Sequence, residues 1–385
     1  MIKRLLLIVL LYSYGILSAQ EISYNRTETL RYFQNMDFES CLEWLKTKQL
    51  DAYNKSYLMD MGYCYYMMEM PLEARDTYLK IAAQEPLDFQ ANLFLATIYD
   101  NQIYNKDDSA AFYYKMLTTI QPQQSKFWYL GGRSLNSVRE YDAAFAYFEK
   151  AFELNPSSGK ITVAYAKALE RRKEGDRAAK VIDAFLAKDN ANVDVIQKKI
   201  SMSHKLKAFK DVIYWGELLL KDSLPPASSF YSYMYLAYSY LNTNQIDKSI
   251  ALCDCLIEHN LGAEQITYCL ALCYGKKGDY TRSNHLLDEC IELNLLDQAQ
   301  TYFRAKADNY TLMKQYAKAA SEIDTSFYIF QDPIDLYLAG KIYDDLKNKP
   351  KAALYYKKFL SQKKNPASPL EAKLENYIKE YLKAD

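Results

Sequence analysis

Small residues recur along this chain at a nearly constant spacing. Successive members of the series are 33 to 37 residues apart, and nine of the ten are Ala, Ser or Cys. A small residue at such regular intervals marks a place where two helices approach closely, so the pattern predicts a helical repeat. This column of ten residues consists of Cys41, Ala74, Ala110, Ala144, Ala178, Val212, Ser249, Ser283, Ala319 and Ala352.

A second column of small residues runs about twelve residues ahead of the first. Its members are Gly62, Ala96, Gly132, Ala166, Ala237, Ala271, Ala307 and Gly340, and in six units a Tyr follows three residues later. Short polar turns such as residues 139–142 and 277–280 separate the two columns. Each unit is therefore predicted to be two antiparallel helices joined by a turn, and Pro86, Pro122 and Pro156 close three of the units.

One unit, residues 125–158, shows the whole pattern and defines a numbering for the others, with Trp128 at position 4. At helical spacing, positions 4, 8 and 11 of the first helix face the packed interior. Positions 2, 5, 9 and 12 share another face of the same helix.

The signature residues of this unit resemble those of the tetratricopeptide repeat family. They are Trp128, Gly132, Tyr141, Ala144, Phe148, Ala151 and Pro156. The resemblance covers roughly residues 22 to 366, and it implies an all-α chain, a right-handed superhelix (solenoid) of about ten helix–turn–helix units. We expect an N-terminal array over residues 22–226, a C-terminal array over 227–366 and a capping helix within 367–385. The Pro- and Ser-rich segment 222–229 between the arrays is either a hinge or an ordinary loop.

The N-terminus has the layout of a secretory signal peptide. Lys3 and Arg4 precede an apolar stretch from Leu5 to Leu17, and small residues end at Ala19. The stretch is short for a membrane span, although a retained anchor or a buried helix are alternatives. We therefore expect residues 1–19 to be removed and the protein to be exported, with the periplasm of a Gram-negative bacterium as its location.

The composition agrees with an all-α chain and limits the classes of partner that are expected. Gly (11) and Pro (10) are scarce, whereas Tyr occurs 37 times, mostly at expected core positions. A net charge of +0 gives no reason to expect nucleic acid or an anionic membrane as partner. Of the seven Cys residues, five lie between Cys253 and Cys290, namely Cys253, Cys255, Cys269, Cys273 and Cys290. In an exported protein one pair could form a disulfide, but each also suits a small apolar position.

No pattern of catalytic residues is present. The three His residues show no metal-ligand spacing, and neither a phosphate-binding loop nor a nucleophile motif occurs. A metal site from Cys269, Cys273 and His285 is a weak alternative. Because the repeats leave no span for a catalytic domain, we expect a chain that is not an enzyme and that needs no cofactor.

The resemblance implies that the first helix of each unit lines the partner-binding surface, so positions 2, 5, 9 and 12 form the predicted binding face. This face is uneven, with two aromatic, Met-containing patches around a more basic middle. We expect partner contacts from Met59, Tyr63, Tyr66, Tyr129, Arg133, Lys167, Tyr231, Met234, Tyr238 and Tyr268. Packing against neighbouring helices is the alternative role for the tyrosines. The clamp by which some proteins of this family hold a C-terminal carboxylate is missing, although Arg133 and Lys167 could meet an acidic segment. These features favour a scaffold that binds an extended segment of another envelope protein, with a glycan-binding protein as the alternative.

Overall fold

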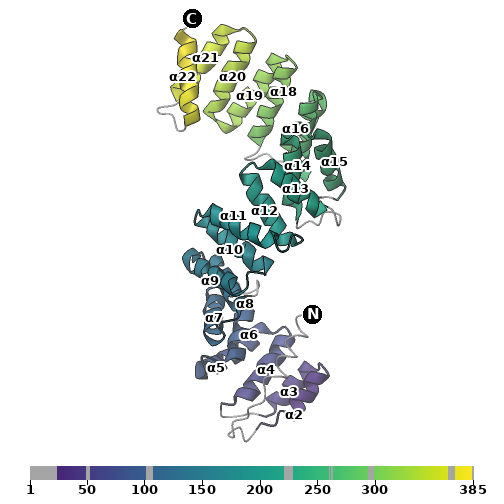
Figure 1. Ribbon diagram of the computed structural model, residues 1–385, viewed down its shortest axis with the longest axis vertical. Coiled ribbons are helices and arrows are strands. Elements are labelled where there is room, and N and C mark those ends of the chain that lie inside the picture. The colour runs from purple at the N-terminus through teal and green to yellow at the C-terminus, as the bar shows by residue number, and fades with distance from the viewer. Residues whose placement is uncertain are drawn as a thin grey trace. The chain divides into compact units, whose positions relative to one another are not determined.

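The structure is a computed structural model, and it describes residues 24–48, 53–100, 107–220, 229–259, 261, 263–293, 299–362 and 369–383. Within these residues the regular structure is helical throughout, with 21 α-helices (Figure 1). The chain divides into two compact units, Met1–Asp189 and Asn190–Asp385, which are described separately. The predicted signal peptide and residues 222–228 of segment 222–229, expected to be a hinge or an ordinary loop, lie outside the described residues.

The described part of the first unit contains ten helices, and each packs against the next along the chain. They pair as α2 with α3, α4 with α5, α6 with α7, α8 with α9, and α10 with α11. Their bounds are α2 (Thr27–Gln34), α3 (Phe38–Lys46), α4 (Lys55–Met67), α5 (Pro71–Gln84), α6 (Phe89–Tyr99), α7 (Asp107–Ile120), α8 (Ser125–Ser137), α9 (Tyr141–Leu154), α10 (Gly159–Arg171) and α11 (Gly175–Leu186).

The second unit contains five further pairs and a final helix, α22, which packs against α21 (Figure 1). The all-α architecture of about ten helix–turn–helix units with a terminal helix is therefore confirmed. The bounds are α12 (Val193–Lys205), α13 (Phe209–Leu220), α14 (Phe230–Asn242), α15 (Ile246–Glu258), α16 (Ala263–Lys277), α17 (Tyr280–Leu293), α18 (Ala299–Leu312), α19 (Tyr316–Phe330), α20 (Pro333–Asp345), α21 (Lys349–Gln362) and α22 (Pro369–Lys383).

The small residues lie where the two helices of a pair meet. All ten members of the first column are buried. In two units the columns touch directly, because Ser249 Oγ donates to the carbonyl oxygen of Ala237 at 2.9 Å, and Ser283 Oγ to that of Ala271 at 2.7 Å. The close approach predicted from the spacing is thus present in the structure.

Residue size is matched across seven of the helix pairs. Where the second column holds Gly, the residue sixteen positions later is a large aromatic: Tyr78 follows Gly62, Phe148 follows Gly132 and Tyr356 follows Gly340. A Cβ atom added to any of these glycines would come within 2.8 Å of the aromatic ring. Where the column holds Ala166, Ala237, Ala271 or Ala307, the corresponding residue is the smaller Ile182, Cys253, Leu287 or Ile323. The ring therefore occupies the space that a Cβ would need.

The turn inside each pair repeats the same backbone conformation. A residue with positive φ stands five positions before the small residue in nine units, and only one of the nine is Gly. The next residue donates its N–H back to the carbonyl of position 11, as Glu174 does to Leu169 at 2.9 Å. This is the Schellman closure of a helix. The nine residues are Met36, Glu69, Arg139, Lys173, Lys207, Asn244, Gly278, Lys314 and Lys347.

The expected division of the array after residue 226 stays a prediction. Helices α13 and α14, which flank that point, pack against each other within the second unit. All seven cysteines are free thiols and six are buried, in keeping with small apolar positions. No helix among the described residues is long and apolar enough to cross a lipid bilayer.

Candidate partner-binding faces

Three of the predicted contact residues are buried. Met59, Tyr63 and Met234 are 5%, 3% and 3% exposed and belong to the hydrophobic cores of their units. The ring of Tyr63 makes edge contacts with Phe33 and Phe38 of the preceding helix pair, at centroid distances of 5.1 and 5.8 Å. In this structure these side chains stabilise the fold and offer almost no surface to a partner.

Four more of the predicted residues are half-buried, and three of them pack on aromatic rings of adjacent helices. Tyr66 contacts Phe94, Tyr129 contacts Phe148, and Tyr268 contacts Tyr302 at a centroid distance of 4.8 Å. Burial raises the pKa of Tyr268 to about 12 and also raises the pKa of Tyr238. Tyr238 and Tyr268 are therefore neutral phenols at neutral pH. The ring contacts of Tyr66, Tyr129 and Tyr268 agree with the alternative of packing against neighbouring helices.

The remaining three predicted residues, Arg133, Lys167 and Tyr231, are exposed. Tyr231, on α14, has 68% of its surface accessible. Arg133 lies on α8 and Lys167 on α10, the first helices of two consecutive pairs. The structure therefore retains the basic middle of the predicted face and one residue of the C-terminal aromatic patch as accessible surface.

Two further lysines extend the basic middle. Lys126 on α8 and Lys160 on α10 are exposed and stand at position 2, seven residues before Arg133 and Lys167. None of the four forms an ion pair or a side-chain hydrogen bond with a residue in the described part of the chain. The predicted contacts do not include these two lysines. Their separation of 34 residues, which equals the repeat spacing, is the sequence feature that identifies them as equivalent positions.

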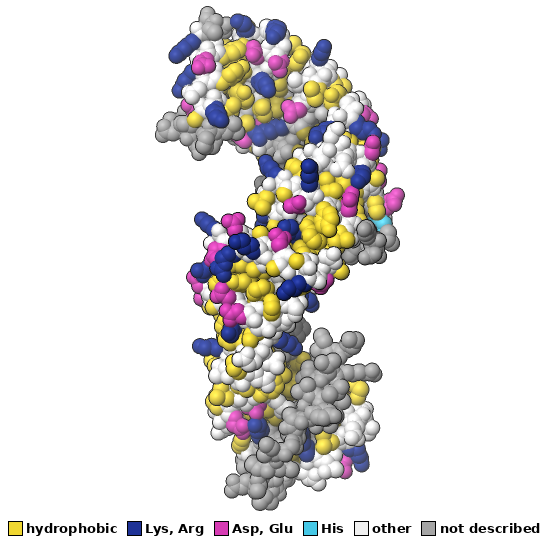
Figure 2. All heavy atoms as spheres, viewed as in Figure 1, with side chains coloured by type: hydrophobic (Ala, Val, Ile, Leu, Met, Phe, Trp, Pro, Cys, Tyr) yellow, Lys and Arg dark blue, Asp and Glu magenta, His cyan; other side chains and the backbone are white. Residues whose placement is uncertain are grey.

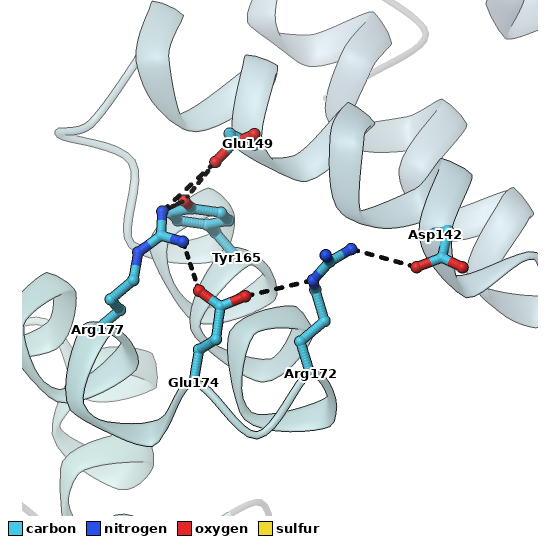
Figure 3. Close-up of polar contacts among 6 residues, drawn as sticks. All are labelled: Asp142, Glu149, Tyr165, Arg172, Glu174 and Arg177. Atoms are coloured by element: carbon cyan, nitrogen blue, oxygen red, sulfur yellow. Dashed lines mark hydrogen bonds and ion pairs between the residues drawn. The ribbon is translucent and has the colours of Figure 1, made fainter.

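Two neighbouring arginines, by contrast, form ion pairs with carboxylates of the fold. Figure 3 shows Arg172 and Arg177 in a chain of charges with Asp142, Glu149 and Glu174. Arg172 lies 3.2 Å from Asp142 and 3.3 Å from Glu174, and Arg177 pairs with Glu174 and lies 3.5 Å from Glu149. This chain of charges links α9 to α11. Figure 2 likewise shows Lys and Arg mixed with Asp and Glu over the α9–α11 part of the first unit.

The phenol of Tyr165 lies within the same network. It donates to Glu149 Oε1 at 2.9 Å and accepts from Arg177 Nη2 at 3.1 Å (Figure 3). Burial and the adjacent Glu149 carboxylate raise the pKa of Tyr165 to about 12. The phenol therefore stays protonated at neutral pH and keeps donating to Glu149.

In the second unit, four consecutive helix pairs use a cation in a different structural role. In each pair a Lys or Arg, eight residues after the Tyr of position 11, lies over that Tyr ring. The pairs are Lys248 over Tyr240 (5.2 Å), Arg282 over Tyr274 (4.0 Å), Lys318 over Tyr310 (5.4 Å) and Lys351 over Tyr343 (4.9 Å). These cations hold the two helices of a pair together and shield the ring edge from water.

A cavity of about 270 Å³ adjoins the basic middle. Asn136, three residues after Arg133, lines the cavity and accepts a hydrogen bond from Arg171 Nη1 of α10. The Arg171 guanidinium also lies over the ring of Tyr141, 3.9 Å from its centroid. Ala144, Phe148 and Ala168 supply apolar walls. The cavity can accept a small side chain beside a polar rim.

Helix pairs that recur every 33 to 37 residues, small residues where the helices of a pair meet and a repeated turn define the described chain as an all-α helical-repeat protein. Residues 137–198 match the family model described as Tetratricopeptide repeat. These residues therefore match the tetratricopeptide repeat family, and the helix pairs along the rest of the described chain have the same helix–turn–helix architecture. No group of three or more His, Cys, Asp or Glu side chains that could hold a metal ion occurs among the described residues.

Solved structures agree with this class. A tetratricopeptide repeat protein from Parabacteroides merdae is 17% identical over 67% of this chain and 97% of its own, with a TM-score of 0.50. Yeast Tom70 (12% identity, 92% and 94% coverage, TM-score 0.40) and MamA from Desulfovibrio magneticus (16%, 44% and 94%, TM-score 0.37) are more distant. Only the first likeness supports the fold. The sequence matches no curated protein.

Proposed function

We propose that this chain is a protein-interaction scaffold of the cell envelope that binds an extended segment of a partner protein on the first helices of its pairs. The observation that carries the proposal is the set of accessible side chains that the fold does not use. Arg133 and Lys167 stand at position 9 of consecutive first helices, and Tyr231 stands at position 2 of α14. The scaffold class of the repeat supports the same function.

The envelope location rests on the signal-peptide layout of residues 1–19. A fusion of the whole chain to alkaline phosphatase, which folds only outside the cytoplasm, tests it. We expect phosphatase activity from the intact chain and none after replacement of Lys3, Arg4 and the apolar stretch. Activity that persists without this segment would count against export by a signal peptide.

A photo-crosslinking residue at position 231 tests the binding function. Tyr328 on α19, a second helix of the same unit, is the matched control, because it is also an exposed tyrosine (81% against 68%). We expect crosslinks from position 231 to one or a few envelope proteins and none from position 328. Equal crosslinking at both positions would show that the first helices form no specific face.

Glycan binding has weaker support. A sugar stacks only on a ring face that solvent can reach, and of the six tyrosines predicted on the face only Tyr231 is exposed; Tyr63 is buried and the other four are half-buried. Saturable binding of an oligosaccharide that is lost in Tyr231→Ala, without any protein crosslink, would favour glycan binding over protein binding.

A further inference from the structure

Cations occupy both positions 2 and 9 in only two units of the sequence, and these two units are adjacent. The fourth unit has Lys126 and Arg133, and the fifth has Lys160 and Lys167. The other units carry at most one cation at these positions. Their residues are Ser23 and Leu30, Ser56 and Tyr63, Gln90 and Thr97, Asp194 and Ser201, Tyr231 and Tyr238, Gln265 and Leu272, Thr301 and Asp308, and Ile334 and Lys341.

The structure places these four cations on helices α8 and α10, both within the first compact unit, Met1–Asp189. Residues seven apart in an α-helix share one face and are separated by about 10.5 Å along the axis, at 1.5 Å per residue. All four side chains are exposed, and Arg171 of α10 reaches Asn136 of α8, so the two helices are linked at one end of the surface. We call this surface, formed by Lys126, Arg133, Lys160 and Lys167, the four-cation face.

Two carboxylates flank the four-cation face at position 12 of their helices. Asp100 follows α6 and accepts a hydrogen bond from Tyr114 at 3.3 Å, and Glu170 lies near the end of α10. Four exposed cations against these two carboxylates leave an excess of positive charge. At about 0.1 M salt the screening length is about 10 Å, close to the spacing of the cations, so an anionic ligand is attracted by several of them together.

The spacing selects an extended peptide. An extended segment in the polyproline II conformation has three residues per turn and rises about 3.1 Å per residue, so carboxylates three residues apart lie on one side, about 9 Å apart, and match positions 2 and 9. Position 5, between the cations, holds Tyr129 on α8 and Val163 on α10, both half-buried. An apolar side chain between two acidic ones therefore has a surface to cover. A nucleic acid would favour several accessible aromatic rings, whereas this face has one half-buried tyrosine.

We propose that the four-cation face docks an extended acidic segment of a partner protein, with acidic residues three apart and apolar residues between them. This inference rests on the proposed scaffold function and names the chemistry of its partner. The cavity lined by Asn136 and Arg171 adjoins the end of the face and can receive a small side chain of the same segment.

A short fluorescent peptide with glutamate at every third position and leucine between is the probe. Its fluorescence anisotropy with the full chain gives Kd at several salt concentrations. The test variant is Arg133→Glu/Lys167→Glu. The matched control is Lys180→Glu/Lys188→Glu, which makes the same change in charge at exposed lysines on and just after the second helix α11.

We expect the Kd to rise at least tenfold, about 1.4 kcal/mol, in the test variant and less than twofold in the control. A glutamine version of the peptide should not bind. If both variants weaken peptide binding equally, the binding depends only on the net charge of the chain, and the inference is overturned. Tighter binding to a single-stranded oligonucleotide or to phosphatidylglycerol vesicles, lost in the same test variant, would assign the face to another ligand. Circular dichroism of both variants establishes that they are folded.

A crosslinker at position 163 separates this inference from the proposed function. Crosslinks from both 163 and 231, with peptide binding, support both. Crosslinks from 231 without any from 163, and no peptide binding, leave the scaffold function standing and overturn the acidic-segment inference. If neither position crosslinks while the peptide also fails to bind, the proposed function fails as well.

Discussion

Replacement of Gly340 by Ala tests the packing rule that fixes this fold. An added Cβ would lie 2.4 Å from Cε1 and 2.5 Å from Cδ1 of Tyr356, whereas ordinary carbon contacts are 3.4 to 4 Å. The ring must therefore move by about 1 Å. Tyr356 is fully buried, and Tyr337, Tyr377 and Tyr381 surround it at centroid distances of 6.0, 6.3 and 5.1 Å. These neighbours oppose the movement.

The expected cost follows from two opposing effects. Overfilling a packed core costs about 1–3 kcal/mol, and so short a contact belongs near the upper end of that range. Gly to Ala inside a helix returns about 1 kcal/mol. The free energy of unfolding should therefore fall by about 2 kcal/mol, which lowers the Tm of a unit of this size by roughly 4–8 °C.

Urea unfolding followed by circular dichroism measures the effect. Gly175→Ala is the control, because a Cβ there has no neighbour within 4 Å, and its stability should be unchanged or slightly raised. In Gly340→Ala/Tyr356→Ile the pair copies Ala307 and Ile323, two members of one core cluster. The double variant should be more stable than the sum of the single changes predicts. Additive losses, or a Gly340→Ala variant as stable as the control, would refute the packing argument.

Three further changes test individual contacts. Lys173→Gly should raise the free energy of unfolding by about 0.5–1 kcal/mol, because Lys173 has φ 65° and Gly removes that strain, as urea midpoints would show. Arg304→Met should cost about 3–5 kcal/mol in the same assay, because it leaves the fully buried Asp335 without the guanidinium 2.6 Å away. Burial by itself raises the pKa of Asp332, but hydrogen bonds from the Ile334 N–H and from Arg304 hold this pKa below its ordinary value. The charged carboxylate therefore stabilises the fold at neutral pH, and this stabilisation is lost as the pH falls below about 4. Asp332→Asn keeps the helix cap and should flatten that loss in urea midpoints between about pH 5 and pH 2; an unchanged slope would contradict the assignment.

The helix pairs could be predicted from sequence because steric demand fixes residue size. Only a small residue fits where two backbones approach, so the column from Cys41 to Ala352 is visible without an alignment. The turn conformation could not be predicted in the same way. Residues as different as Met36, Glu69 and Lys347 adopt positive φ there. The backbone hydrogen bond that closes the helix determines this conformation, and it leaves no signature in residue type.

The candidate site could be predicted less completely than the fold. Helical periodicity predicts on which face of a helix a side chain lies, but not whether neighbouring helix pairs bury it. Tyr63 stands at position 9, the position of Arg133 and Lys167, yet it is buried. Its ring contacts Phe33 and Phe38 from the preceding pair and Phe94 from the following one. Large aromatic residues on successive units cover one another, so an aromatic patch on the predicted face becomes core.

The same argument shows where the information about a partner lies in this chain. Positions 4, 8 and 11 are constrained in every unit by packing, so their residues describe the fold. Positions 2 and 9 are free to vary wherever their side chains stay exposed, and Lys126, Arg133, Lys160 and Lys167 form no ion pair or side-chain hydrogen bond with the described residues. Cations that the fold does use, such as Arg172 and Arg282, are held by a carboxylate or an aromatic ring. Exposed charge that packing does not explain, repeated at the unit spacing on adjacent first helices, is therefore the feature that points to a ligand.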